Sequence, residues 1–293
     1  MASSKPRAPQ SISGQVGITG VFGDPVQHSM SPAMHNAAYA ALAIDRVYLA
    51  FHVTPPHLAA AMRALPALGI LGVNLTVPHK EAAFRMLKHL SAEAKLLRAV
   101  NCIINHHGRL HGDNTDARGL EADLRALGVE LKSRLAIIIG AGGAAAAAIL
   151  ACARMGATRI AIANRTHSRA TSLARRFRSS RIEIEAHGLD ALTDASLLAD
   201  AALVLNATSM GLTTGTFAPL DCEATPENCF FYDAIYRAEP TPFLNDAIAH
   251  GRPHADGAGM LVGQGELAFE LFNGVAPPPG VMERALFQRL GRA

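Results

Sequence analysis

Residues 134–153 read RLAIIIGAGGAAAAAILACA, and this stretch decides the fold class. Residues 134–139 form a dense run of branched apolar side chains, which is typical of a strand buried on both faces of a parallel sheet. Glycines follow at positions 140, 142 and 143, and an alanine-rich segment comes next. Because glycine marks turns and alanine favours helices, the stretch predicts a strand, a tight turn and a helix.

The glycines have the spacing of a dinucleotide-binding turn. Gly140, Gly142 and Ala145 fit the pattern GxGxxG/A. Gly140 permits the tight turn, Gly142 lets backbone N–H groups approach a pyrophosphate, and the small Ala145 lets helix and strand pack closely. Glycine turns of this kind also serve close packing alone. The position between a strand and a helix favours a cofactor site.

The segment after the next strand, expected over residues 159–163, indicates which dinucleotide binds. A site for NAD carries an acidic residue about 20 positions after the glycines. Here the strand is followed by Asn164, Arg165 and Thr166, with Arg169 close behind, and none of them is acidic. Since arginine forms charge-assisted, often paired bonds with phosphate, these residues predict NADP. The alternative is a solvated helix start, capped by Thr166 or a nearby serine.

Strands and helices alternate over residues 118–256, as in a doubly wound domain of Rossmann type. The expected strands are residues 134–139, 159–163, 181–186, 202–206 and 229–233. The expected helices are residues 119–127, the alanine-rich segment and residues 168–177.

The first third of the chain alternates in the same way. The expected strands are residues 16–22, 47–52, 72–77, 100–106 and 109–113, of which the last two form a hairpin. The expected helices are residues 32–42, residues 56–65 and a segment that begins at Pro78. Ser31 is expected to cap the first of these helices, with Pro32 at its first position.

The predicted architecture is α/β with two domains. Residues 1–117 plus 257–293 are expected to form an α/β substrate-binding domain, because two amphipathic stretches near the C-terminus (260–272 and 281–290) should pack back on the first domain. Residues 118–256 are expected to form the Rossmann-type NADP-binding domain. The polar first twelve residues are expected to be a disordered tail.

Composition argues against several functional classes. A formal net charge of +3 over 293 residues is too small and scattered for nucleic-acid binding. The 13 histidines include no HExxH pair and the four cysteines no CxxC, so no metal site is expected. The uncharged residues 135–153 are interrupted by glycines, which disfavours a membrane span. Since no secretory signal is visible, a cytoplasmic protein is predicted.

Two serines and the end of a strand suggest a polar site in the first domain. Ser29 and Ser31 flank an expected helix start, where hydroxyls and free N–H groups can hold a carboxylate. Asn74 and Thr76 lie on the same face of an expected strand. Lys80 follows just past the strand end, where open α/β sheets place their ligands.

With these residues, the chain resembles the shikimate dehydrogenase family. The motifs of that family stand here, in order, as HSMSPAMHN (28–36), NLTVPHK (74–80), AVNC (99–102), GDNTDARG (112–119), GAGGAA (140–145), NRT (164–166), NATSMG (206–211) and GAGMLVGQ (257–264). The resemblance implies reversible, NADPH-dependent reduction of 3-dehydroshikimate to shikimate, in the shikimate pathway of aromatic amino-acid biosynthesis. It also implies a monomer or homodimer.

The resemblance assigns roles residue by residue. Lys80 and Asp116 are implied to be catalytic. Substrate contacts are implied for Ser29, Ser31, Asn74, Thr76, Lys80, Asn101, Asp116, Tyr236 and Gln264. Cofactor contacts are implied for Gly140, Ala141, Gly142, Gly143, Ala144, Asn164, Arg165, Thr166, Arg169, Ala207, Thr208, Ser209, Met210 and Gly257. The chain departs from the family pattern at Leu75, Cys102, Gly265 and Leu212, and none of these departures removes a polar group assigned to the site.

Lys80 is expected to face the oxygen on which charge develops, and Asp116 is expected to hold Lys80. Because such a pair titrates as a unit, the proton donor is not assigned to one member. A structural salt bridge is the alternative. His28, His35 and His79 are expected to be cap or packing residues. Two other functions stay open: a quinate/shikimate dehydrogenase of broader substrate and NAD(P) specificity, and a non-catalytic NADP-binding sensor.

Overall fold

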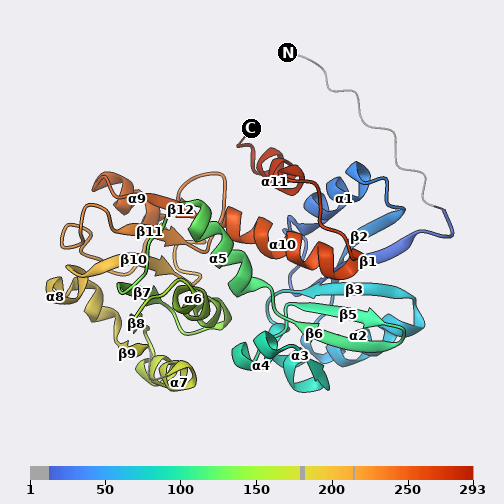
Figure 1. The fold of residues 1–293 in the computed structure, drawn as a ribbon, viewed down its shortest axis with the longest axis horizontal. Helices are drawn as coiled ribbons and strands as arrows, with labels where there is room; N and C mark the ends of the chain where they lie inside the picture. The colour runs from blue at the N-terminus through green and yellow to red at the C-terminus, as the bar shows by residue number, and fades with distance from the viewer. Residues whose placement is uncertain (1–12, 179–181, 214, 293) are drawn as a thin grey trace, which may run out of the picture.

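Two six-stranded sheets, each flanked by helices, make up the chain (Figure 1). The computed structural model describes residues 13–178, 182–213 and 215–292. The tail expected at residues 1–12 lies outside the described residues. Within them, no helix is long and apolar enough to cross a membrane.

The first sheet is mixed and has the order β2-β1-β3-β5-β6-β4. Its strands are β1 (Gly17–Gly23), β2 (Arg46–His52), β3 (Ile70–Leu75), β4 (His89–Leu90), β5 (Cys102–His106) and β6 (Arg109–Asp113). Strand β1 pairs in parallel with β2 and β3, while β5 runs antiparallel to β3 and β6. The expected hairpin is therefore confirmed as β5 and β6.

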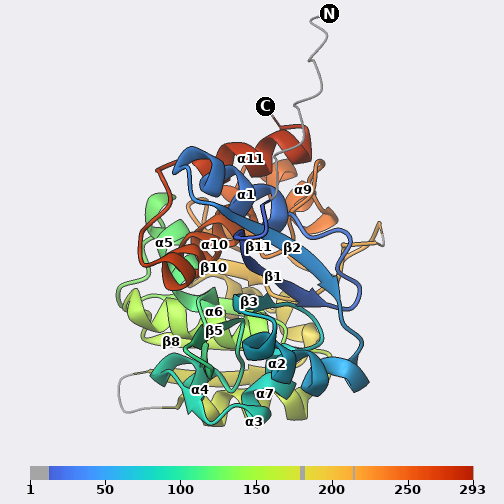
Figure 2. The same ribbon diagram turned by 90° about the vertical axis from the view of Figure 1, so that its right-hand side faces the viewer.

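Helices cover both faces of this sheet (Figure 2). One face is covered by α1 (Ser31–Ala41), α10 (Ala258–Asn273) and α11 (Val281–Leu290), whose apolar side chains share a core with β1, β2 and β5. The other face is covered by α2 (Leu58–Ala67), preceded by a 3₁₀ turn at Pro55–His57, and by α3 (Lys80–Met86) and α4 (Ala92–Leu97). The C-terminal helices thus return to the first sheet, as predicted.

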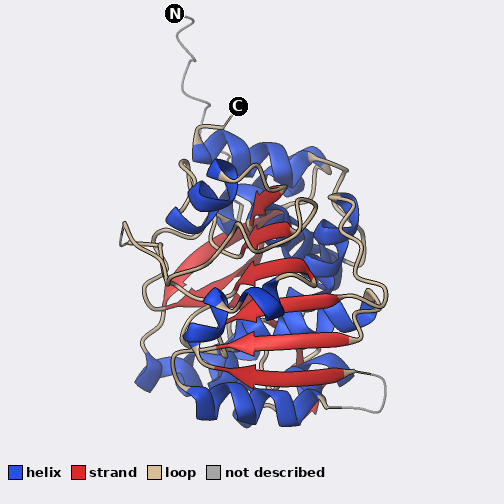
Figure 3. Ribbon diagram, turned by 90° about the vertical axis from the view of Figure 1, so that its left-hand side faces the viewer, coloured by secondary structure: helices blue, strands red, loops and turns tan. Residues whose placement is uncertain are grey.

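The second sheet is parallel throughout, with the order β12-β11-β10-β7-β8-β9 (Figure 3). Its strands are β7 (Leu135–Ile139), β8 (Arg159–Ala163), β9 (Glu183–His187), β10 (Ala201–Asn206), β11 (Phe230–Asp233) and β12 (His254–Asp256). One face packs on α5 (Asp116–Ala126), α6 (Gly143–Arg154) and α7 (His167–Phe177). The other face packs on a 3₁₀ segment (Leu189–Thr193), α8 (Ala195–Leu198) and α9 (Pro242–Ala249). This order confirms the doubly wound unit.

Helix α5 leads from the first sheet to the second and crosses α10 at very short range. A Cβ atom added to Gly119 would lie 2.5 Å from the backbone nitrogen of Gln264. One added to Gly263 would lie 3.1 Å from the Cα of Gly119. The crossing therefore depends on glycine, and it brings Asp116 and Gln264, which come from distant parts of the sequence, to one place.

Two helix starts differ from the predictions. Helix α1 begins at Ser31 with Met30 as its N-cap, because Met30 already has helical backbone angles and its carbonyl accepts from Ala33 and Met34. Helix α3 begins at Lys80 and not at Pro78, because a turn closed by the His79 N–H and the Thr76 carbonyl precedes it. Several short elements were not expected (α4, α8, α9, β4 and β12). They are too short to show a clear hydrophobic period.

Candidate active site

A pocket of about 320 Å³ opens at the carboxyl ends of β1 and β3. The residues expected to bind substrate gather there: its lining includes Ser29, Ser31, Asn74, Thr76, Lys80, Asp116, Tyr236 and Gln264. Its apolar lining includes Val21, Val26, Met260 and Leu261. The pocket thus combines an apolar wall with convergent polar groups, as small-molecule sites do.

Lys80 and Asp116 meet in this pocket. Each is the first residue of a helix, α3 and α5 respectively, and Lys80 Nζ donates to Asp116 Oδ2 at 2.6 Å. The side chain of Asp116 is 8% exposed and that of Lys80 is 28% exposed, so the ammonium is the more open member. Since an ammonium has three hydrogens, Lys80 keeps donors for a bound molecule after it has bonded to Asp116.

A buried network of hydrogen bonds holds Asp116 in place. Asn101 Nδ2 donates to Asp116 Oδ1 at 2.7 Å, while Asn101 Oδ1 accepts from the Thr115 N–H at 2.9 Å. Asn114 Oδ1 accepts from the Asp116 N–H at 3.0 Å. Asn101 itself is buried and is not part of the pocket lining. It is hydrogen-bonded to two residues of the lining, Asp116 and Asn74.

Asn74 is oriented by Tyr48, a residue that the sequence did not single out. The hydroxyl of Tyr48 donates to Asn74 Oδ1 at 2.8 Å, and Asn74 Nδ2 donates to the Asn101 carbonyl at 3.1 Å. Burial raises the pKa of Tyr48 well above its usual value, so its hydroxyl remains a donor. Tyrosine in an apolar strand reads as a core residue, and only the fold places its hydroxyl on the site.

The start of α1 forms another wall of the pocket. Ser29, Ser31 and His28 line it, and Ser29 Oγ accepts from the Ser31 N–H at 3.3 Å. Hydroxyls at the N-terminus of an 11-residue helix suit a carboxylate, because the helix dipole and the free N–H groups favour negative charge.

Two of the three histidines near the site have packing roles, as predicted. The ring of His35 is fully buried and stacks on Tyr48, with ring centroids 4.1 Å apart. Burial lowers the pKa of His35 to about 3, so the ring is neutral at physiological pH. His79 Nε2 lies 2.6 Å from the Val53 carbonyl, which anchors the turn before Lys80. His28 lines the pocket.

A second pocket, of about 370 Å³, lies at the carboxyl ends of the second sheet's strands. It gathers most of the residues expected to bind cofactor and adds Leu189, for which the sequence carried no signal. Its lining includes Gly140, Ala141, Gly142, Asn164, Arg165, Arg169, Leu189, Ala207, Thr208, Ser209 and Met210. Of the other expected residues, Gly143, Ala144 and Thr166 are outside this lining, and Gly257 lines the first pocket.

This second pocket fits a dinucleotide that carries an extra phosphate. Gly140 has φ +117°, which glycine tolerates, and a Cβ at Gly142 or Gly143 would meet open space, so the backbone at the start of α6 is accessible. The exposed guanidinium groups of Arg165 and Arg169 have no hydrogen-bond or ion-pair partner among the described residues. They are therefore free to bind a phosphate.

The loop after β10 is held by a buried carboxylate. Asn206 Oδ1 accepts from the Thr208 N–H at 3.0 Å, and Asn206 Nδ2 donates to Asp233 Oδ1 at 2.9 Å. Asp233 also accepts from Thr241 Oγ1 at 2.5 Å and from the Ile235 N–H at 3.0 Å. Burial raises the pKa of Asp233 to about 6. Asp233 thus sets the path of the loop that carries Thr208.

Comparison with known protein families assigns most of the chain to shikimate dehydrogenases. Residues 21–103 match the shikimate dehydrogenase substrate binding domain. Residues 123–215 match the shikimate / quinate 5-dehydrogenase family, and residues 257–287 match the shikimate 5'-dehydrogenase C-terminal domain.

Whole proteins agree with these matches. The shikimate dehydrogenase (NADP(+)) of Citrifermentans bemidjiense is 41% identical over 95% of this chain and 97% of its own length. The crystal structure of shikimate 5-dehydrogenase from Thermus thermophilus in complex with NADP(H) and shikimate has a TM-score of 0.84 and 37% identity, covering 94% of this chain and 100% of that one. The enzyme from Listeria monocytogenes, in complex with shikimate and NAD, has a TM-score of 0.88 and 29% identity, covering 96% of this chain and 99% of that one. The chain belongs to the shikimate dehydrogenase family.

Proposed function

We propose that this protein is an NADP-dependent shikimate dehydrogenase, which reduces 3-dehydroshikimate to shikimate and catalyses the reverse oxidation. The observation that carries the proposal is the Lys80–Asp116 contact of 2.6 Å in a pocket whose other polar groups are hydroxyls, amides and the imidazole of His28. Such groups suit a ligand with one carboxylate and several hydroxyls. We divide the chain into a substrate-binding domain, residues 1–117 plus 257–293, and a cofactor domain, residues 118–256.

The cofactor NADPH, when bound, supplies a hydride to the carbonyl carbon of the substrate. Gly140 and Gly142 would hold its pyrophosphate at the start of α6, and Arg165 and Arg169 would hold its 2′-phosphate. The acidic residue of an NAD site is missing after β8, which supports NADP as the preferred cofactor.

Lys80 would act on the oxygen of the reacting carbonyl. An ammonium beside that oxygen stabilises negative charge as it develops and can pass on a proton, which leaves an alcohol. Asp116 would hold Lys80 in place through the 2.6 Å contact, and Asn101 fixes Asp116 in turn. The proton is assigned to the Lys80–Asp116 pair as a unit.

The remaining polar groups would orient the substrate. Ser29 and Ser31, at the start of α1, would bind its carboxylate. Asn74, Thr76 and Gln264 would face its hydroxyls, with Tyr236 nearby, since all four line the same pocket. Asn101 would support these contacts through Asn74 and Asp116, to which it is hydrogen-bonded.

Two observations favour a second candidate, an enzyme of broader specificity. One matching family description includes quinate, and the related Listeria monocytogenes enzyme was crystallised with NAD. Arg165 and Arg169 argue for NADP, but the pocket side chains give no comparable argument against quinate, which carries an additional hydroxyl.

Nicotinamide absorbance would be followed with purified protein in four mixtures, shikimate or quinate, each with NADP⁺ or NAD⁺. We expect fast reduction only with shikimate and NADP⁺. Comparable rates with quinate or NAD⁺ would move the protein to the broader class. Tight NADPH binding without turnover of any substrate would indicate a sensor. We also propose a cytoplasmic monomer or homodimer, and sedimentation equilibrium would decide between the two oligomeric states.

A further inference from the structure

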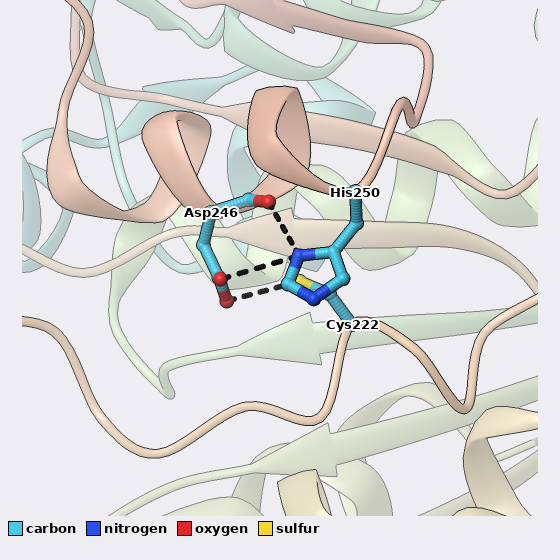
Figure 4. A group of neighbouring side chains, drawn as sticks. All are labelled: Cys222, Asp246 and His250. Atoms are coloured by element: carbon cyan, nitrogen blue, oxygen red, sulfur yellow. Dashed lines mark hydrogen bonds and ion pairs between the residues drawn. The ribbon is translucent and has the colours of Figure 1, made fainter.

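Three side chains that can bind metals, each of different chemistry, meet on the face of the second sheet that packs on α9 (Figure 4). Cys222 lies between β10 and β11 and is buried, whereas Asp246 is partly exposed within α9. His250 follows Asp246 by one helical turn, so the two share a helix face, and it is exposed. None of the three lines the substrate or cofactor pocket described above.

The distances between their ligand atoms are close to those of a tetrahedral metal site. Cys222 Sγ lies 3.1 Å from Asp246 Oδ2, and His250 Nδ1 lies 3.4 Å from Asp246 Oδ1. All three ligand atoms lie within 4.8 Å of one another. Zinc bonds of about 2.0–2.3 Å at tetrahedral angles would separate such atoms by roughly 3.3–3.6 Å. Adjustments of a few tenths of an ångström at Asp246, and a somewhat larger one between Cys222 and His250, would close the site.

The three side chains are held together by hydrogen bonds to Asp246. Both Cys222 and His250 point at the same carboxylate, and His250 Nδ1 also lies 2.9 Å from the Asp246 carbonyl, so both groups serve as donors. A metal ion would replace these protons, as metal binding to thiols and imidazoles does.

We propose that Cys222, Asp246 and His250 form a structural site for a divalent ion of the zinc class. The sulfur ligand favours Zn²⁺ over Mg²⁺ and Ca²⁺, which prefer oxygen. The exposed side of His250 leaves room for water as the fourth ligand. The ion would tie the segment after the cofactor loop to α9. It is not needed for hydride transfer, because the cluster is separate from both pockets.

The experiment is a competition titration of the untagged, reduced chain with Zn²⁺ against a chromophoric chelator, repeated with Co²⁺ as a spectroscopic probe. We expect one ion per chain and a thiolate-to-cobalt charge-transfer band. Cys222→Ser and His250→Ala should each weaken binding by roughly 100-fold or more, because loss of a supporting residue alone typically costs 10–100-fold. His250→Ala changes an exposed side chain, so it remains informative if Cys222→Ser does not fold.

Two control variants separate this site from other thiols and imidazoles. Cys229→Ser removes a different buried thiol. His111→Asn disrupts a group of three histidines, in which the ring centroid of His111 lies 5.0 Å from that of His89 and 5.1 Å from that of His106. Both variants should bind the ion like the unmodified chain. The proposal is overturned if the unmodified chain binds no Zn²⁺, if His250→Ala binds it equally well, or if His111→Asn abolishes binding.

Measuring shikimate oxidation by the same variants separates the test of the metal site from the test of the proposed enzyme function. The Cys222→Ser and His250→Ala variants should oxidise shikimate within about twofold of the unmodified rate, since neither residue lines a pocket. A loss of Zn²⁺ binding with unchanged turnover supports the site. Zinc binding by a protein that turns over no substrate would refute the enzyme function alone.

Discussion

The hydroxyl of Tyr48 donates to Asn74 Oδ1 at 2.8 Å, and both residues are buried. This contact uses the acceptor of the amide, and the Asn101 carbonyl accepts one hydrogen of Nδ2. The other Nδ2 hydrogen is left for the pocket. Tyr48 is therefore a positioning residue: it sets the orientation of Asn74 without lining the pocket itself.

Replacing Tyr48 with phenylalanine removes this donor and leaves the Asn74 amide held only by its bond to the Asn101 carbonyl. We expect the KM for shikimate to rise about tenfold, which corresponds to about 1.4 kcal/mol, with kcat changed by less than about threefold. The control is Tyr39→Phe, because Tyr39 is also buried and its hydroxyl pairs with Thr19 Oγ1 at 2.9 Å, away from the pocket. Equal KM changes in the two variants would show that Tyr48 has only a packing role.

Lys80→Ala should lower kcat by about 10²–10⁴-fold, the usual range for loss of an acid–base group. Steady-state kinetics would measure kcat, and fluorescence or calorimetric titration would measure shikimate binding. Lys88→Ala is the control, since Lys88 is exposed in the segment that follows α3. If Lys80→Ala lowers the melting temperature while kcat stays near that of the unmodified chain, Lys80 forms only a structural salt bridge.

Arg165→Ala and Arg169→Ala should each raise the KM for NADP⁺ by about tenfold, because a charge-assisted bond to phosphate contributes about 1.5–3 kcal/mol. The KM for NAD⁺, which lacks the 2′-phosphate, should stay within about twofold. Arg175→Ala, at the other end of α7 and exposed, controls for the loss of a positive charge. Equal effects on both cofactors would mean that these arginines do not bind the 2′-phosphate.

Gly119→Ala tests the crossing of α5 and α10. The added Cβ would lie 2.5 Å from the Gln264 nitrogen, so one helix must shift. We expect the free energy of unfolding to fall by about 1–3 kcal/mol and the KM for shikimate to rise, because Asp116 and Gln264 move apart. Gly14→Ala, where a Cβ would meet open space, is the control for urea unfolding and kinetics. An unchanged KM with lower stability would show that the α5–α10 crossing stabilises the fold but does not position the substrate site.

Asp233 should make stability depend on pH. Burial raises its folded pKa to about 6, above the unfolded value of about 3.9. Between these values the folded chain keeps a proton that the unfolded chain has lost, so this contribution to stability falls as pH rises. Relative to the unmodified chain, Asp233→Asn should therefore gain about 2 kcal/mol of unfolding free energy between about pH 4.5 and about pH 7.5.

Urea unfolding of both chains at the two pH values would measure this gain. Asp45→Asn provides the control, because Asp45 is exposed. A difference between Asp233→Asn and the unmodified chain that does not vary with pH would contradict a raised pKa in the folded state.

Local patterns in the sequence were enough to predict most of the strands and helices. The strands at residues 159–163 and 109–113 have the predicted bounds, because their ends are marked by changes of composition that need no tertiary information. The predicted starts of α1 and α3 were wrong, because a proline or serine near a helix start fits more than one position within a turn. The sequence singled out Arg165 and Arg169, which line the second pocket, because a site for NAD carries an acidic residue at that spacing.

The sequence by itself determined the residue types: the glycines after β7, the arginines after β8, and the Lys80 and Asp116 pair. Tertiary structure alone decided which side chains support them. Tyr48 reaches Asn74 because parallel pairing places β1 between β2 and β3, and Cys222 meets His250 because α9 packs beside its loop. These contacts join residues 26 to 28 positions apart, beyond any local period, so only chain packing could reveal them.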